Sequence, residues 1–165
     1  MKGEFKFSVT DKDERIVELV GKTDHKTLAI WAIDCVERVI SKFEDKYPED
    51  HRPRTALEVL RTWIQTGMFK MAIIRKASLD AHTAAREVGE DSAARSAARA
   101  AGQAVATAHV PTHSIAAANY ALQAIHRDTR SSDVDAVIAK ERDWQYRHLL
   151  ELRNSQAKPK DDTPS

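Results

Sequence analysis

The sequence predicts an all-α fold, a single compact bundle of about six helices whose inner helices are rich in alanine. From about residue 22 onward, apolar residues recur at steps of three and four, the spacing that places side chains on one face of a helix. Glycine, proline and helix-capping residues separate these stretches. Of the 25 alanines, 18 lie between Ala77 and Ala124. Because small side chains let helix backbones approach closely, we expect a tightly packed, antiparallel inner layer there.

Composition and charge restrict the classes of partner. A length of 165 residues fits one domain with a sizeable core. The 26 basic residues nearly balance the 25 acidic ones and leave a formal net charge of +1. This balance gives no electrostatic reason to expect a nucleic acid or an anionic membrane as a partner. The single cysteine, Cys35, lies among apolar residues, so we expect it to be buried and unreactive.

No targeting or membrane-spanning segment is evident. The N-terminal stretch MKGEFKFSVTDKDER lacks the uninterrupted apolar core of a signal peptide. No stretch approaches the roughly twenty apolar residues that span a bilayer. The sequence therefore predicts a cytoplasmic protein.

Residues 1–21 form an N-terminal arm that differs from the rest of the chain. Phe5, Phe7 and Val9 alternate with polar residues, and further apolar residues follow before Gly21. This pattern predicts a short β-hairpin, with a single strand or an irregular arm as alternatives.

Residues 22–153 form the helical domain, and its first helix is expected to be central. Thr23 or Asp24 can accept the free amides that open a helix. An apolar stripe then continues to Phe43 and is widened by further apolar residues, so we expect this helix to be buried on most sides. The polar segment YPEDHRP ends it.

The second helix has a recognisable start and end. Asp50 is a good N-cap. Pro53 is tolerated in the first turn, because the amides there have no partner within the helix and proline therefore loses no hydrogen bond. Gly67 fits the left-handed position that ends many helices. A third helix is expected over about residues 69–88.

The remaining helices follow from caps and breakers. A fourth is expected over about residues 92–108, a fifth after Pro111, and a sixth from Ser132 to about Leu152. The tail, residues 154–165, is polar and contains prolines, a composition typical of disorder.

Three histidines are candidate binding residues: His82, His109 and His113. A helical pair spaced by four residues can supply two metal ligands, because both side chains lie on one face. Pro111 interrupts that geometry between His109 and His113, since it cannot continue the helical hydrogen bonding. Val110 also stands where a metalloprotease motif requires glutamate.

Capping is the better motivated interpretation of the pair. His109, at the end of one helix, can hydrogen-bond to free carbonyls. His113, near the start of the next, is favoured in its neutral form. Whether His82 converges with them is left open by the sequence.

Arg52 and Arg54 form a second candidate cluster beside a predicted helix start. Two arginines at that place can contact an anion or a carboxylate of a partner. The alternative is an exposed loop whose charges pair with one another. If either arginine turns inward to Asp34 or Asp80, the pair is structural instead.

Motifs of catalysis are missing. The chain has only five glycines, and none forms a phosphate-binding or dinucleotide-binding loop. No serine or cysteine is visibly paired with a base. We therefore expect no enzyme activity, no cofactor and no metal.

Several segments, in order, resemble a family of bacterial proteins. They are LAIWAIDCVERVISKFE (28–44), RPRTALEVLRTW (52–63), AHTAAR (81–86), AARAAGQAVATAHVPTH (97–113), YALQAI (120–125) and ERDWQYRHLLELR (141–153). The resemblance is to the immunity-five-like putative immunity proteins, and it covers about residues 22–153. The run over 97–113 is its most distinctive part.

This resemblance implies a small helical protein that binds and neutralises a cognate toxin by occlusion, without catalysis. It carries over no agreed set of contact residues. An alternative from another class is a small-molecule or metal-dependent enzyme with a pocket lined by His82, His109 and His113. A homo-oligomer with a purely structural role is a third interpretation.

Overall fold

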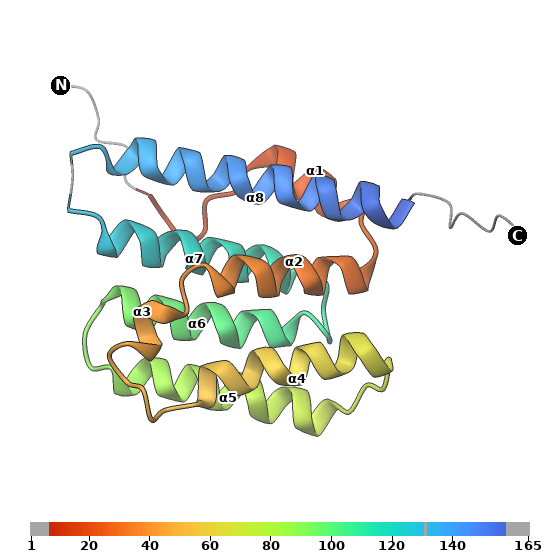
Figure 1. The fold of residues 1–165 in the computed structure, drawn as a ribbon, viewed down its shortest axis with the longest axis horizontal. Coiled ribbons are helices and arrows are strands. Elements are labelled where there is room, and N and C mark those ends of the chain that lie inside the picture. The colour runs from red at the N-terminus through yellow and green to blue at the C-terminus, as the bar shows by residue number, and fades with distance from the viewer. Residues whose placement is uncertain (1–6, 131, 158–165) are drawn as a thin grey trace, which may run out of the picture.

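The computed structural model describes residues 7–130 and 132–157, and within these the chain forms eight helices and no strand. The long helices run close to one common direction and stack from α1 and α8 on one side to α4 and α5 on the other (Figure 1). In chain order the helices are α1 (Glu14–Gly21), α2 (His25–Glu37), α3 (Ser41–Glu44), α4 (Arg52–Thr66), α5 (Met71–Glu87), α6 (Ala93–Ala106), α7 (His113–Asp128) and α8 (Val134–Ala157). The predicted all-α class is confirmed, and the predicted number of six helices is wrong.

The β-hairpin predicted for residues 1–21 is not found in the described part of the chain. Residues 1–6 lie outside the described part of the chain, and the segment that follows leads into α1 rather than a second strand. Ile16, Leu19 and Val20 are spaced for one helical face and are buried. Asp13 caps this helix, because its carboxylate accepts from the amides of Arg15 and Ile16.

The predicted central helix is divided into α2 and α3. The amides of Val39 and Ile40 both donate to the carbonyl of Val36, so regular helical bonding is interrupted there. Phe43 on α3 is still 1% exposed, which keeps the apolar stripe in the core. No glycine or proline lies at this break, so the sequence contains no local signal for it.

Several predicted helix ends are confirmed. Asp24 accepts a hydrogen bond from the amide of Thr27 at the start of α2. Ser92 accepts from the amide of Arg95 at the start of α6. Gly67 adopts φ 68° at the end of α4, the left-handed conformation that glycine tolerates best.

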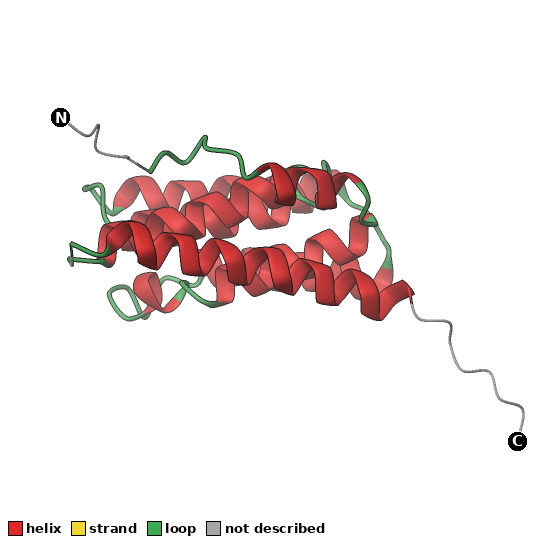
Figure 2. Ribbon diagram, turned by 90° about the horizontal axis from the view of Figure 1, so that it is seen from above, coloured by secondary structure: helices red, strands yellow, loops and turns green. Residues whose placement is uncertain are grey.

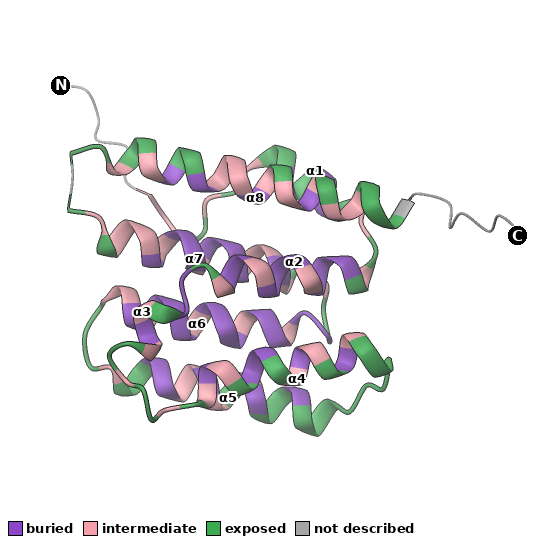
Figure 3. Cartoon of the chain, viewed as in Figure 1, coloured by how far each residue is buried: buried purple, intermediate pink, exposed green. Residues whose placement is uncertain are grey.

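Helix α6 lies at the centre of the bundle. It packs against α5 and α7 and also contacts α2, α3 and α4. Most of its surface is buried, whereas α4, α5 and α8 each expose one face (Figure 3). Buried alanines between Ala94 and Ala104 pack against the neighbouring helices, as expected where helix backbones approach closely. The expected inner layer is thus centred on α6, and α5 forms its outer edge.

Helix α8 covers α2 and α7. The indole Nε1 of Trp31 donates to the backbone carbonyl of Gln145 at 2.9 Å, and both residues are fully buried. Arg38 forms two hydrogen bonds with Glu141 and places its guanidinium 3.8 Å from the ring centre of Trp144. The helix continues to Ala157, so residues 154–157, which the sequence assigns to the tail, are helical. The rest of the predicted tail lies outside the described residues.

Most connecting loops lie at the two ends of the bundle (Figure 2). One end carries the loop between α4 and α5 and the corner between α6 and α7; the other carries the start of α4 and the end of α5. None of the described helices has the length and apolarity needed to cross a membrane.

Candidate functional site

A pocket of about 310 Å³ lies between α5, α6 and the start of α7. His82 reaches it from α5, His109 from the α6–α7 corner, and His113 from the first residue of α7. The other residues that line it are Met71, Ile74, Arg75, Ser78, Leu79, Gln103 and Ala106. The structure therefore brings together the three histidines whose convergence the sequence left open. We call this cavity the histidine pocket.

The α6–α7 corner places His109 and His113 on different elements, as Pro111 predicts. Helix α6 ends at Ala106, and the amides of His109 and Val110 both donate to its carbonyl. His113 begins α7, and its Nδ1 lies 2.8 Å from Oε1 of Gln103. Because an amide oxygen can only accept, Nδ1 of His113 carries a proton.

His109 does not cap α6. Its side chain makes no hydrogen bond within the described chain, and its exposed ring stacks on Phe69, with the centroids 6.0 Å apart. The carbonyl of Thr107 at this helix end is instead hydrogen-bonded to Nε2 of His25. The capping role predicted for His109 is therefore filled by a histidine from α2, which no local sequence signal indicates.

His82 is held as a neutral imidazole. Its ring packs on Gly102 so closely that a Cβ there would lie 2.7 Å from Nε2. Its Nδ1 is buried and has no hydrogen-bond partner among the described residues. Burial, reinforced by the positive charges of Arg99 and Arg86, lowers the pKa of His82 to about 4.

His113 is also favoured in its neutral form. Burial and the neighbouring His109 lower its pKa. Among the described residues, no three His, Cys, Asp or Glu side chains are placed to hold one metal ion. The three histidines share a pocket without the convergence that a metal site requires.

An exposed apolar surface adjoins the histidine pocket. Seven large apolar residues are exposed in the described chain, and six of them lie in the α4–α5 loop, on α5 or at the α6–α7 corner. The six are Met68, Phe69, Met71, Ile73, Leu79 and Val110, which we call the apolar surface. Met71 and Leu79 also line the histidine pocket, and the stacking of Phe69 on His109 links the α4–α5 loop to the α6–α7 corner.

Sequence reasoning missed this surface, although part of the signal is visible. Ile74, Ala77 and Ala81 form the buried stripe of α5. Ile73 and Leu79 fall outside that stripe, at 49% and 53% exposure. Large apolar residues that lie outside the buried stripe of a helix indicate either a further packing partner or an interaction surface.

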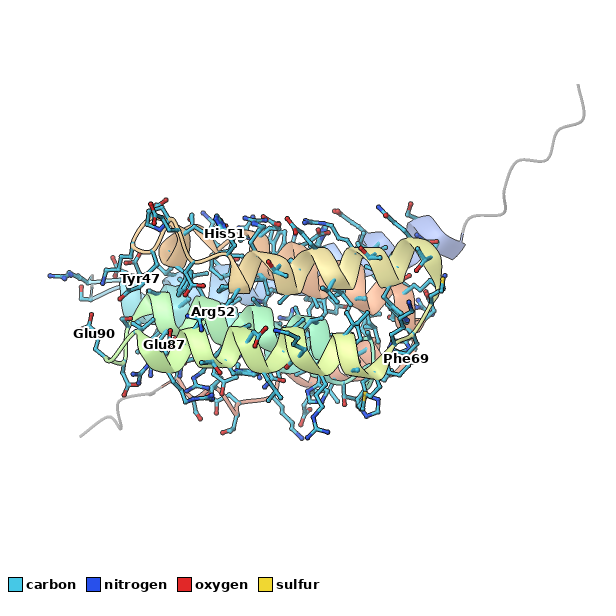
Figure 4. The ribbon with its side chains drawn as sticks, turned by 90° about the horizontal axis from the view of Figure 1, so that it is seen from below. Tyr47, His51, Arg52, Phe69, Glu87 and Glu90 are labelled. Carbon is cyan, nitrogen blue, oxygen red and sulfur yellow. The ribbon has the colours of Figure 1, made fainter. Side chains whose placement is uncertain are left out.

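Arg52 lies at the opposite end of α4 from Phe69 (Figure 4). Arg54 is in the same first turn of α4. Arg52 pairs with Asp50 at 2.7 Å and with Glu87 at 2.5 Å. Arg54 pairs with Glu44 at 2.7 Å and also with Glu37.

These two arginines are engaged with partners other than the two that the sequence suggested. Asp34 pairs with His148, and Asp80 pairs with Lys76. The contacts of Arg52 join α4 to α5, and those of Arg54 join α4 to α2 and α3. The structure therefore does not bring either arginine to the histidine pocket.

Comparison with known proteins agrees with the resemblance seen in the sequence. The family model described as Imm-5 like putative immunity protein matches residues 18–152, which include the whole histidine pocket and the whole apolar surface. A search of curated proteins found no match, and neither did a search of solved structures. Since the matched region covers well over half of the chain, the protein belongs to the Imm-5 like putative immunity protein family.

Proposed function

We propose that this protein binds a cognate toxin domain and neutralises it by covering its active site, without turnover. The family supports an immunity role. The observation that carries the proposal is the apolar surface, because groups of large exposed apolar residues are typical of protein-binding sites.

The composition of this surface suits a protein partner. Binding energy in such interfaces is concentrated in a few aromatic, apolar or arginine residues surrounded by a polar rim. Phe69 and Met68 project from the loop between α4 and α5, with exposures of 45% and 63%. Lys70 and Arg75 lie beside them and make no ion pair within the described chain, so they can form part of the rim.

An enzyme with a histidine-lined pocket is the second candidate, favoured by the presence of His82, His109 and His113 in the lining of one pocket. A general base usually needs a group that orients its ring and stabilises the imidazolium. Here the partner of His113 is the uncharged amide of Gln103, and the buried Nδ1 of His82 has no partner in the part of the chain that the structure describes. Binding therefore fits the pocket better than acid–base catalysis.

The proposal is tested by co-expression with toxin candidates encoded beside the gene. We expect rescue of growth and a complex that survives size-exclusion chromatography. Replacing Phe69 and Ile73 by serine should weaken the complex at least about tenfold, as for anchor residues of an interface. The matched control is Val17→Ser, because Val17 is the exposed apolar residue on α1, outside the apolar surface.

Two results would contradict the proposal. One is that no candidate toxin is neutralised or bound. The other is that Val17→Ser weakens the complex as much as the serine substitutions at Phe69 and Ile73, which would place the interface elsewhere.

A further inference from the structure

We propose that the histidine pocket binds a carboxylate group on an apolar stem, presented by an acidic side chain of the protein partner. The source of the carboxylate rests on the proposed function, whereas the chemistry of the pocket does not.

The charge around the pocket is positive and unpaired. Arg75 lines it, and Arg86 and Arg99 act electrostatically on His82. Within the described chain, none of these three arginines pairs with a carboxylate; Arg86 donates only to the hydroxyl of Thr83. By contrast, Arg52 and Arg54 each contact two carboxylates.

The acidic residue that interacts electrostatically with one of these arginines is Glu87, which acts on Arg86 and lies outside the pocket lining. The pocket lining contains neither aspartate nor glutamate. Asp80, in the same stretch of α5, is paired with Lys76. The pocket lining thus contains one arginine, Arg75, that has no carboxylate partner within the described chain, and this charge is complementary to an anion from outside.

The lining favours a carboxylate over a phosphate. Met71, Ile74, Leu79 and Ala106 give the pocket apolar walls that suit a hydrocarbon stem. The planar guanidinium of Arg75 can pair with both oxygens of a carboxylate. A phosphate needs more donors, commonly several backbone amides at a helix start. The hydroxyl of Ser78 already donates to the carbonyl of Gly102 at 2.9 Å.

His113 supplies a second donor when it takes up a proton. Its Nδ1 is engaged with Gln103, which leaves Nε2 as the nitrogen available to a ligand. In the neutral ring Nε2 can only accept, and in the protonated ring it donates. A bound carboxylate favours the protonated ring and offsets the effects of burial and of His109. The other charged group of the lining is Arg75, and His82 remains neutral beside it. Binding should therefore strengthen as the pH falls.

The place of the pocket identifies the source of the carboxylate. Met71 and Leu79 belong to both the pocket and the apolar surface. A partner that covers the apolar surface therefore also covers the mouth of the pocket. An acidic residue at that point of the partner would meet Arg75 and His113 as the water is excluded.

The chemistry is tested first on the protein alone by NMR, with benzoate as the probe and benzamide as its uncharged analogue. We expect benzoate to shift the backbone amides of Ser78, Gly102 and Gln103 in a saturable way. The affinity for benzoate should rise as the pH is lowered from about 8 to about 6, and this rise should disappear in His113→Gln.

Arg75→Gln should weaken the binding of benzoate about five- to tenfold, as expected for a charge-assisted hydrogen bond. Arg147→Gln, a change to an exposed arginine on α8, should leave it unchanged.

Three results would overturn the carboxylate site. Benzamide would bind as well as benzoate, or inorganic phosphate would shift the same amides at lower concentration, or the affinity would be the same in Arg75→Gln as in Arg147→Gln.

The source is tested separately in the complex with the toxin. A double-mutant cycle between Arg75→Gln and each acidic-to-amide substitution in the toxin should show coupling for one pair. If benzoate binds but no pair couples, the partner is ruled out as the source. If no toxin binds at all, the proposed function fails while the benzoate result stands on its own.

Discussion

His82 on α5 packs its ring directly on the backbone of Gly102 on α6, where a Cβ would lie 2.7 Å from Nε2. This contact explains a glycine in the middle of a helix that is otherwise rich in alanine. It also sets how closely α5 and α6 approach beside the histidine pocket. The position of the ring therefore depends on a residue that carries no side chain.

Gly102→Ala should be destabilising by about 1 kcal/mol, because overpacking against the ring outweighs the better helix propensity of alanine. In the background of His82→Ala the sign should reverse, and the same change should stabilise by about 0.5–1 kcal/mol. Urea unfolding followed by circular dichroism measures both values. Equal effects in the two backgrounds would show that the two residues do not interact.

Stability should fall as the pH is lowered from about 7 to about 5, by about 1 kcal/mol from His82 after allowance for solvent screening. The pKa of His82 is lowered to about 4 from 6.5, so the unfolded chain binds this proton first. The contribution of neutral His82 to stability is complete at a pH above the pKa of the unfolded chain. It is lost as the pH falls towards the pKa of the folded protein. Carboxylates whose pKa is lowered in the folded protein, such as Glu44 and Asp50, change the stability mainly at pH values below this range.

The measurement is the free energy of unfolding of the wild type and of His82→Gln at several pH values. The variant should show the shallower dependence. The same slope in both proteins would place the titration at another group.

Arg54→Gln should destabilise the protein by about 1 kcal/mol and leave the affinity for a partner unchanged. The side chain lies between Glu37 and Glu44, and its removal leaves both carboxylates without that cation. Arg147→Gln is the matched control, since Arg147 is 73% exposed and pairs only with Asp143, four residues earlier. Denaturant midpoints and a binding titration separate the two effects. A loss of affinity at unchanged stability would assign Arg54 to the interface instead.

Trp31→Phe should cost about 2 kcal/mol, because it removes a buried hydrogen bond and part of a fully buried ring. Nε1 of Trp31 is the donor to the carbonyl of Gln145, which joins α2 to α8. Thermal unfolding of the variant measures the cost. A loss below about 0.5 kcal/mol would mean that α8 is held by its other contacts.

The sequence located most helices because their ends depend on local chemistry. Asp24 and Ser92 accept amides within the next turn, and Gly67 adopts a conformation that disfavours other residues. The errors lie where the signal is weak or conflicting. The alternation of Phe5, Phe7 and Val9 predicted strands just before a segment that is helical.

The site was harder to predict than the fold, because it depends on how helices are rotated and aligned against one another. His82, His109 and His113 could be named as candidates, and Pro111 correctly separated the last two. The sequence did not show that His25 would take the helix-end position predicted for His109. It also did not show which carboxylates would pair with Arg52 and Arg54.

The all-α class, most helix limits and the division at Pro111 were therefore contained in the sequence, since each follows from interactions within a few residues. The placing of His82 and His113 in one pocket, the presence of Arg75 beside them and the exposure of Leu79 come from the tertiary structure alone. The reason is that alanines and Gly102 bring α5, α6 and α7 close together. That packing sets the rotation of each helix and so determines which of its side chains meet.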